Sequence, residues 1–187
     1  DVFTALTSGD KNVAVGTLTL DANTVGGENV AIGYDALTTD TQGSHSVAVG
    51  PSALRSQNFT SATNTFNTAV GSFAMYTNTT GANNTAVGRS ALYANTTGTT
   101  NTAVGATSLD ANTTGIRNAA LGYGALGANT SGDQNTALGA YSLDANTTAD
   151  NNTAVGYAAL GANTTGTQNT AVGSGALDAN TTGVANV

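Results

Sequence analysis

Three residues that could form a catalytic site lie close together in the sequence: Asp40, His45 and Ser46. A serine becomes an effective nucleophile when a histidine takes its proton and a third group orients that histidine. His45 is the single histidine of the chain, but a repetitive sequence contains many such neighbouring residues by chance. We interpret His45 as a turn residue, and the sequence predicts no catalytic residue and no enzymatic activity.

Carboxylates recur at one position late in the chain, where the residues are Asp110, Gly127, Asp144, Gly161 and Asp178. Two carboxylates about 5 Å apart would repel by about 1 kcal/mol even in water, and an intervening glycine doubles their spacing. A calcium site would instead gather carboxylates, and the glycine- and aspartate-rich repeat of calcium-binding β-rolls is absent. The glycines follow a structural period and not a phosphate-binding motif. The sequence therefore predicts no metal site and no cofactor.

The spacing of these aspartates belongs to a period that runs through the chain. The glycine that closes each N-T-A-V-G phrase recurs every 17 residues, with one step of 21. These ten glycines are Gly16, Gly33, Gly50, Gly71, Gly88, Gly105, Gly122, Gly139, Gly156 and Gly173. A fixed period indicates a solenoid. We expect a single rod over residues 1–187 with a four-residue insertion within 55–66. Because partial repeats stand at both ends, we expect it to be a segment of a longer protein or a filament subunit.

The composition of one repeat favours an all-β solenoid. Helical repeats are usually longer than about 30 residues, and the Gly, Asn and Thr of every repeat disfavour a helix. Thr and Val in N-T-A-V-G favour a strand, the A-L segment offers a second strand, and Asn and Gly suit the turns. The sequence predicts a parallel β-solenoid, or β-roll, of 17-residue coils with two short strands per coil. With coils about 4.8 Å apart, the rod would be roughly 50 Å long.

Stacking places each residue above its own copy in the next coil, so the columns predict the core. Burial of one leucine contributes about 1.5–3 kcal/mol. The predicted leucine column is Leu20, Leu37, Leu54, Met75, Leu92, Leu109, Leu126, Leu143, Leu160 and Leu177. The predicted partner column is Val15, Ile32, Val49, Val70, Val87, Val104, Leu121, Leu138, Val155 and Val172. Asparagine columns, such as Asn84, Asn101 and Asn118 or Asn95, Asn112 and Asn129, are expected to form hydrogen-bonded ladders along the rod.

An invariant alanine lies between the two outer residues of each predicted strand. If the valine column faces the core, these alanines face outward and form an apolar stripe. The stripe is Ala14, Ala31, Ala48, Ala69, Ala86, Ala103, Ala120, Ala137, Ala154 and Ala171. We interpret it as the interface of a homo-oligomer, a trimer or an end-to-end filament. The alternatives are a thin monomeric solenoid whose narrow interior demands small residues, or an alanine stripe that is merely tolerated.

Several further residues are candidates for recognition. The insertion segment contains Arg55, Phe59 and Phe66, and a loop that leaves a repetitive scaffold often binds partners; the alternative is a tolerated surface bulge. Five tyrosines are either exposed contacts or half-buried edge residues: Tyr76, Tyr93, Tyr123, Tyr141 and Tyr157. The N-T-T and N-T-S phrases are formal N-glycosylation acceptors, but they also suit turns. They begin at Asn78, Asn95, Asn112, Asn129, Asn146, Asn163 and Asn180.

Charge and composition exclude some functions. Only 8 % of residues are charged, and the net charge is −7, which disfavours nucleic-acid binding. No apolar run approaches the roughly 18 residues of a membrane-spanning helix. The chain has no cysteine, which weakly fits an extracellular structural protein. We expect no nucleic-acid partner, no membrane insertion and a location outside the cell or on a virion.

The phrases "NVAVG", "NVAIG" and "SVAVG", which begin at Asn12, Asn29 and Ser46, resemble the head repeats of trimeric autotransporter adhesins. The later phrase "NTAVGYAALGANTTG" resembles repeats of bacteriophage tail fibres and related surface fibres. The resemblance covers almost the whole chain. It implies a left-handed β-roll with three chains side by side, which binds a host-surface protein or glycan. The 17-residue repeat is longer than the usual head repeat, so the fold carries over better than the binding partner.

These observations favour a non-enzymatic fibre or adhesin segment that acts through reach, stiffness and multivalency. One alternative is an ice-binding solenoid whose consecutive threonines, from Thr79 and Thr80 to Thr181 and Thr182, order water. A polysaccharide-degrading β-helix enzyme is a weaker alternative, because it needs convergent acids and bases that break the repeat.

Overall fold

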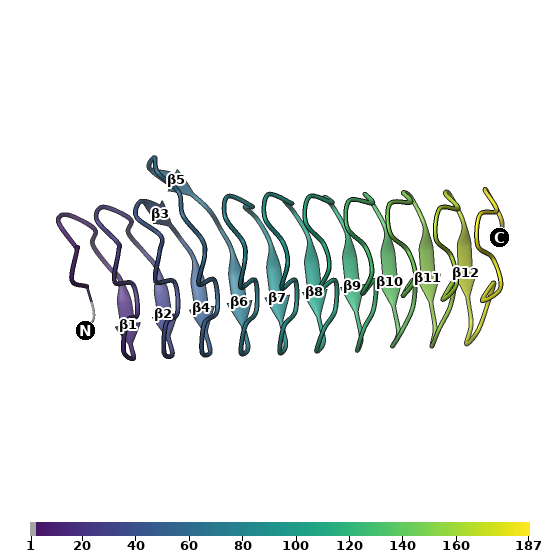
Figure 1. Cartoon of the computed structure of the whole chain (residues 1–187), viewed down its shortest axis with the longest axis horizontal. Coiled ribbons are helices and arrows are strands. Elements are labelled where there is room, and N and C mark those ends of the chain that lie inside the picture. Colours follow the sequence, from purple (N-terminus) through teal and green to yellow (C-terminus); the bar gives the residue numbers. More distant parts are fainter. Residues whose placement is uncertain (1–2) are drawn as a thin grey trace.

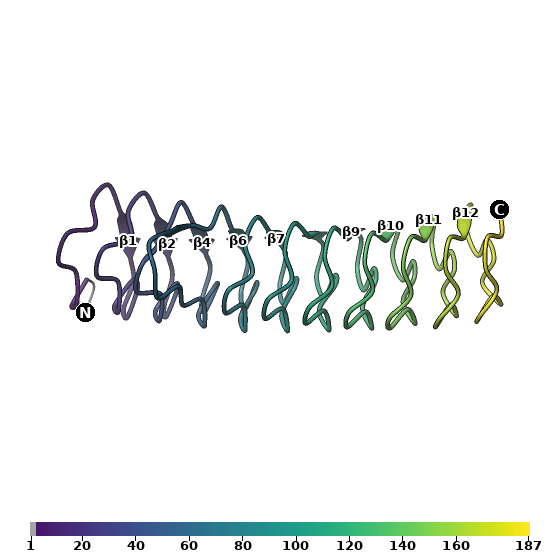
Figure 2. The same cartoon turned by 90° about the horizontal axis from the view of Figure 1, so that it is seen from above.

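The structure, a computed structural model, describes residues 3–187 as an all-β rod of stacked coils with no helix in that range (Figure 1). Ten three-residue strands form one parallel sheet, and Figure 2 shows them in a continuous row along the rod. The strands are β1 (Val13–Val15), β2 (Val30–Ile32), β4 (Val47–Val49), β6 (Thr68–Val70), β7 (Thr85–Val87), β8 (Thr102–Val104), β9 (Ala119–Leu121), β10 (Thr136–Leu138), β11 (Thr153–Val155) and β12 (Thr170–Val172). Each alanine pairs with the alanine one repeat away, as Ala103 does with Ala120. The predicted parallel β-solenoid is confirmed.

Most coils contain one strand, so the prediction of two strands per coil is wrong. The exception is a two-stranded sheet of β3 (Gly43–Ser44) and β5 (Thr63–Asn64). The A-L segment bends because its leucine takes a left-handed backbone conformation, with φ between 50° and 56° throughout the leucine column. The residue two positions earlier is left-handed too, as Thr107 is before Leu109. Extended strand geometry requires a negative φ, so this segment forms stacked turns.

The backbone conformation explains why a glycine follows each strand of the large sheet. Gly105 has φ of 131°, which L side chains rarely adopt, and an added Cβ would lie 2.5 Å from the carbonyl oxygen of Gly122. The equivalent glycines have φ between 129° and 138°. The chain thus turns sharply at the end of each strand while neighbouring coils stay in close contact.

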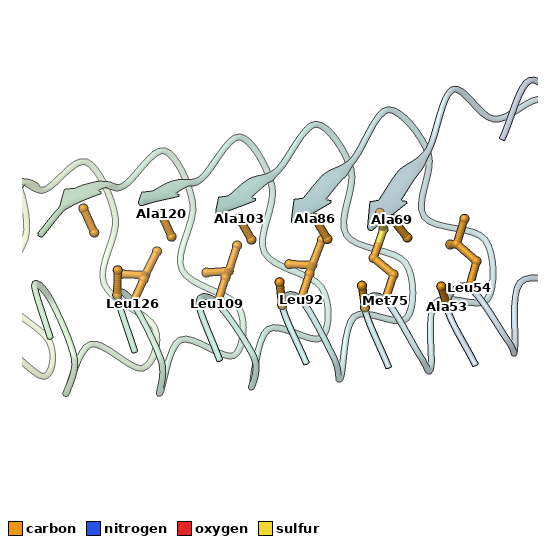
Figure 3. Packing of buried hydrophobic residues seen from close by; sticks show 14 of the residues in the cluster. Ala53, Leu54, Ala69, Met75, Ala86, Leu92, Ala103, Leu109, Ala120 and Leu126 are labelled. Carbon is orange, nitrogen blue, oxygen red and sulfur yellow. The ribbon is translucent and has the colours of Figure 1, made fainter. Parts of the chain in front are cut away.

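The interior of the coil is filled by leucine and alanine (Figure 3). The leucine column is confirmed as core: Leu20 to Leu160, with Met75, are fully buried, and Leu177 in the last coil is half-buried. The strand alanine and the alanine, serine or threonine that precedes the leucine complete each layer, as Ala86 and Ala91 do beside Leu92. One leucine and two small residues therefore make up the apolar cross-section of a coil.

The predicted orientation of the strands is wrong. From Ala31 to Ala171 the strand alanines are at most 2 % exposed, and Ala14 packs against the same core. The residues assigned to the second core column instead lie on the outside, exposed or half-buried: Val15, Ile32, Val49, Val70, Val87, Val104, Leu121, Leu138, Val155 and Val172. The leucine already occupies the narrow interior, which leaves room for a methyl group opposite it but not for a valine. The structure thus agrees with the alternative interpretation of the alanine column, in which a narrow interior demands small residues.

The two asparagine columns stack as predicted and connect the coils. In one, the side chain bonds to backbone: Asn84 Oδ1 accepts from the N–H of Asn101 at 2.9 Å, and Asn101 Nδ2 donates to the carbonyl of Gly115 at 2.8 Å. In the other, side chains bond directly, as when Asn95 Nδ2 donates to Asn78 Oδ1 at 2.7 Å. These asparagines are buried, so the ladders satisfy polar groups that water cannot reach.

Candidate interaction surfaces

One regular surface along the rod is the outer face of the ten-stranded sheet. We define the outer face as the first and third residues of each large-sheet strand, which flank the buried alanine. Val15 is 57 % exposed, Leu138 42 % and Val172 70 %. Val, Ile, Leu, Thr and one Ala occupy these positions in the strands between residues 13 and 172, without any charged residue. The outer face is therefore an uncharged, largely apolar strip along the rod.

The charged side chains belong to the turns and not to the strands that form the outer face. Glu28 Oε1 lies 3.0 Å from Lys11 Nζ, and Glu28 Oε2 lies 3.1 Å from His45 Nε2. The hydrogen bond from Lys11, together with its positive charge, lowers the pKa of Glu28, and the same contact raises the pKa of Lys11. Arg55 pairs through Nε with the carboxylate of Asp35. These contacts link neighbouring coils at their turns.

The predicted insertion leaves the coil between Phe59 and Thr65, and Figure 1 shows β5 projecting beyond the neighbouring coils. The carbonyl of Phe59 accepts from the N–H of Gln42 at 3.1 Å, and the N–H of Thr65 donates to Ser44 at 3.0 Å. Both ends of the projection are therefore held to the coil before it. Residues 60–62 and Asn64 are exposed.

A buried polar network supports the base of the insertion. Asp40 Oδ1 accepts from the N–H groups of Gly43 and Phe59, both at 3.0 Å, and Asp40 Oδ2 accepts from Gln57 Nε2 at 2.6 Å. Gln57 Oε1 in turn accepts from Asn67 Nδ2 at 2.8 Å. Asp40 and Gln57 stand where the neighbouring coils have asparagine. Two substitutions thus adapt the ladder where the chain leaves the regular coil.

The three predicted recognition residues do not form one surface. Phe59 is buried, with 8 % exposure, and belongs to the base of the insertion. Phe66 is exposed and contacts the ring of His45, with centroids 5.2 Å apart. The guanidinium of Arg55 lies over the ring of Tyr76, 5.6 Å from its centroid. Arg55 and Phe66 thus have different neighbours.

Asp40, His45 and Ser46 are not arranged as a nucleophile with its base. Asp40 is buried in the network described above, and His45 Nε2 faces Glu28. Ser46 Oγ is 2.5 Å from Thr65 Oγ1 and accepts from Gln57 Nε2 at 2.9 Å. Each member of the sequence motif therefore has a different structural partner.

The N-T-T and N-T-S asparagines are turn and ladder residues. From Asn78 to Asn163 they are buried, and their amide nitrogens already donate to neighbouring asparagines or to carbonyls. The first threonine donates its hydroxyl to the next coil, as Thr96 does to the carbonyl of Thr113 at 3.0 Å, and the second is exposed. The fold therefore uses one threonine column, and leaves the other facing solvent at a turn.

The tyrosines gather on one side of the coil. All six occur within the five residues that follow the glycine at a strand end. Tyr93, Tyr123, Tyr141 and Tyr157 are exposed, whereas Tyr76 is half-buried and stacks on Tyr93, with ring centroids 5.2 Å apart. Tyr34, which was not among the predicted candidates, is exposed as well. Its position directly after Gly33, the glycine at a strand end, could have identified it from the sequence.

Comparisons with protein-family models, with curated proteins and with solved structures gave no match to this chain. Over residues 3–187, no group of three or more His, Asp or Glu side chains is placed to hold a metal ion, and no enclosed pocket is present. No helix in that range is long and apolar enough to cross a membrane.

Proposed function

We propose that this chain is a non-enzymatic structural segment of an extracellular fibre or adhesin, in which copies associate side by side through the outer face. The observation that carries the proposal is the exposed, uncharged outer face of Val, Ile, Leu and Thr along ten in-register strands. The alanine interface expected from the sequence is replaced by the residues on either side of each alanine.

The size of the outer face is consistent with this role. Ten strands about 4.8 Å apart, each about 10 Å long, present roughly 500 Å². A pair of such faces covers roughly 1,000 Å² in total, which is about the lower limit for a specific interface. In a three-chain arrangement, which the adhesin resemblance implies, each copy would contact two neighbours. Side-by-side packing would thus cover the apolar strip.

Electrostatics favour another copy of the chain as the occupant. The net charge of −7 makes two copies repel wherever their charged turns approach each other. The outer face has no charged side chain, so copies can meet there without placing like charges in contact. A strongly basic partner would find no acidic side chain on this face.

The test is sedimentation of the purified chain and of the variant Leu138→Asp. We expect the chain to sediment as a defined multiple of 18.2 kDa and the variant as a folded 18.2 kDa monomer. The matched control is Thr114→Asp, which adds the same charge at an exposed turn and should leave the oligomer intact. An unaltered chain that stays monomeric at high concentration would overturn the proposal, as would a Leu138→Asp oligomer.

A second candidate, ice binding, is favoured by a specific feature of the same face. Between β6 and β12 the outer face repeats threonine and then Val or Leu, for example Thr85 and Val87, with one interruption at Ala119. This in-register array on strands suits an ordered water layer better than the Thr-Thr pairs, which lie at turns. Ice binding requires a free outer face, so a monomer with thermal hysteresis would favour it over the fibre.

A further inference from the structure

Three exposed tyrosines on consecutive coils form one continuous aromatic patch. Tyr123 and Tyr141 meet edge to face with centroids 5.3 Å apart, and Tyr141 and Tyr157 meet likewise at 6.1 Å. Their exposed fractions are 51 %, 40 % and 60 %, respectively. We call these three residues the tyrosine patch. It lies in the turns that follow β9, β10 and β11, next to the outer face rather than on it.

A glycine fixes the position of the central tyrosine. A Cβ on Gly124 would lie 3.2 Å from Tyr141 Cδ1, so the absence of a side chain there lets the ring lie against the backbone. The same point is 4.0 Å from Asp144 Oδ1. Tyr141 and Asp144 therefore flank one glycine and present an aromatic ring beside a carboxylate.

A second glycine brings two carboxylates together at the rim of the patch. The Oδ1 atoms of Asp144 and Asp110 lie 3.1 Å and 3.5 Å from the position that a Cβ on Gly127 would take. The alternation of Asp and Gly in the sequence predicts that these carboxylates lie far apart. Instead, both side chains lean over the glycine between them.

These carboxylates carry uncompensated negative charge. Neither is part of an ion pair within residues 3–187. Burial raises the pKa of both, and the charge of Asp144 raises that of Asp110 further. An incoming cation would relieve this repulsion, and the adjacent tyrosine faces would attract it as well. Polyanionic ligands are disfavoured for the same reason.

We propose that the tyrosine patch, with Asp110 and Asp144 at its rim, binds a linear polysaccharide of unacetylated amino sugars. Sugar rings would lie along the tyrosines, and their ammonium groups would meet the two carboxylates. Coils about 4.8 Å apart give the patch a regular spacing along the rod, which suits an extended polymer. The proposal deepens the attachment role of the proposed fibre and uses a different surface from the oligomer interface.

Calorimetric titration at about pH 6, where amines are protonated, tests the proposal. The probes are a glucosamine hexamer, its N-acetylated counterpart and hexalysine. We expect the glucosamine hexamer to bind at least about tenfold more tightly than either of the others, because it alone combines sugar faces with ammonium groups. Equal binding of the acetylated hexamer or of hexalysine, or no binding of the glucosamine hexamer, would overturn the proposal.

Variants locate the site. Tyr141→Ala and Asp144→Asn should each weaken binding about tenfold or more, since each removes one cation contact. Tyr34→Ala is the matched control, because Tyr34 is also exposed but lies five coils from Tyr123, the nearest tyrosine of the patch. An equal loss in the control would overturn the assignment. Sedimentation of the same variants separates the two proposals, because a patch variant should keep the oligomer of the unaltered chain.

Discussion

The side-chain amide of Asn112 donates through Nδ2 to Oδ1 of Asn95 in the preceding coil, at 2.9 Å. Asn112 Nδ2 also donates to the carbonyl of Gly115, and Asn112 Oδ1 accepts from the following asparagine, Asn129, at 2.9 Å. One residue thus bonds the coils on both sides and closes its own turn. Because the ladder is buried, each broken link leaves polar atoms without water.

Removal of one ladder residue should destabilise the rod. Asn112→Ala deletes these donors and leaves the Oδ1 of Asn95 without its partner, so we expect a loss of about 1–3 kcal/mol in the free energy of unfolding. Urea denaturation followed by circular dichroism measures it. The control Thr114→Ala changes an exposed residue of the same turn and should stay within about 0.5 kcal/mol. Equal effects of the two substitutions would contradict a ladder that supports the fold.

Because the strand alanine points inward, we expect its substitution to destabilise the rod more than substitution of the neighbouring valine. The sequence predicted the opposite order. Ala103→Val adds volume to a filled interior and should cost about 1–3 kcal/mol. Leu109→Ala should cost about 2–5 kcal/mol, because it removes a fully buried side chain. The control Val104→Ala lies on the outer face and should change the stability of the monomer far less. If Val104→Ala proved more damaging than Ala103→Val, the strand would face the other way.

The buried network below the insertion should depend on Gln57. Gln57→Ala removes the amide that donates to Asp40 Oδ2 and leaves that buried oxygen without a donor. We expect a loss of about 1–3 kcal/mol on thermal or urea unfolding. Asn58→Ala, at the adjacent exposed position, is the control and should have little effect. A neutral result for Gln57→Ala would show that the insertion holds its shape without this link.

The carboxylates beside Gly127 should make stability depend on pH. The pKa values of Asp110 and Asp144 are raised by folding, so the folded state binds protons more readily than the unfolded state. Their contribution to the free energy of unfolding therefore increases as pH falls from neutral through the folded pKa values, and is complete below the unfolded value near 3.8.

The double variant Asp110→Asn with Asp144→Asn isolates this effect. It should be more stable than the unaltered chain at about pH 7, and the difference should shrink towards about pH 4. Urea midpoints across this range measure the difference. Asp178→Asn, at an exposed aspartate of the same repeat position, is the matched control. A difference that does not vary with pH would contradict the raised pKa values.

Much of the architecture follows from the sequence because a stacked repeat is one-dimensional. A residue such as Leu109 can only stack on Leu92 and Leu126 once the period is known, so the core column and the asparagine ladders are predictable. The repeat also shows that the strand positions carry no charged residue. The period could not show which of two apolar neighbours, Ala103 or Val104, points inward.

That choice was decided by the tertiary structure. Thr107 and Leu109 adopt a left-handed backbone conformation, which turns the chain at these two positions without a glycine. Neither residue type favours this conformation, so the sequence does not predict it. The turn brings the leucine into a narrow interior where only a methyl group fits opposite, and the valines move to the surface. The same closeness of coils brings Asp110 and Asp144 over Gly127, although the sequence spacing suggested separation. The repeat by itself determined the columns; the width of the coil decided which columns are buried and which are free to meet a partner.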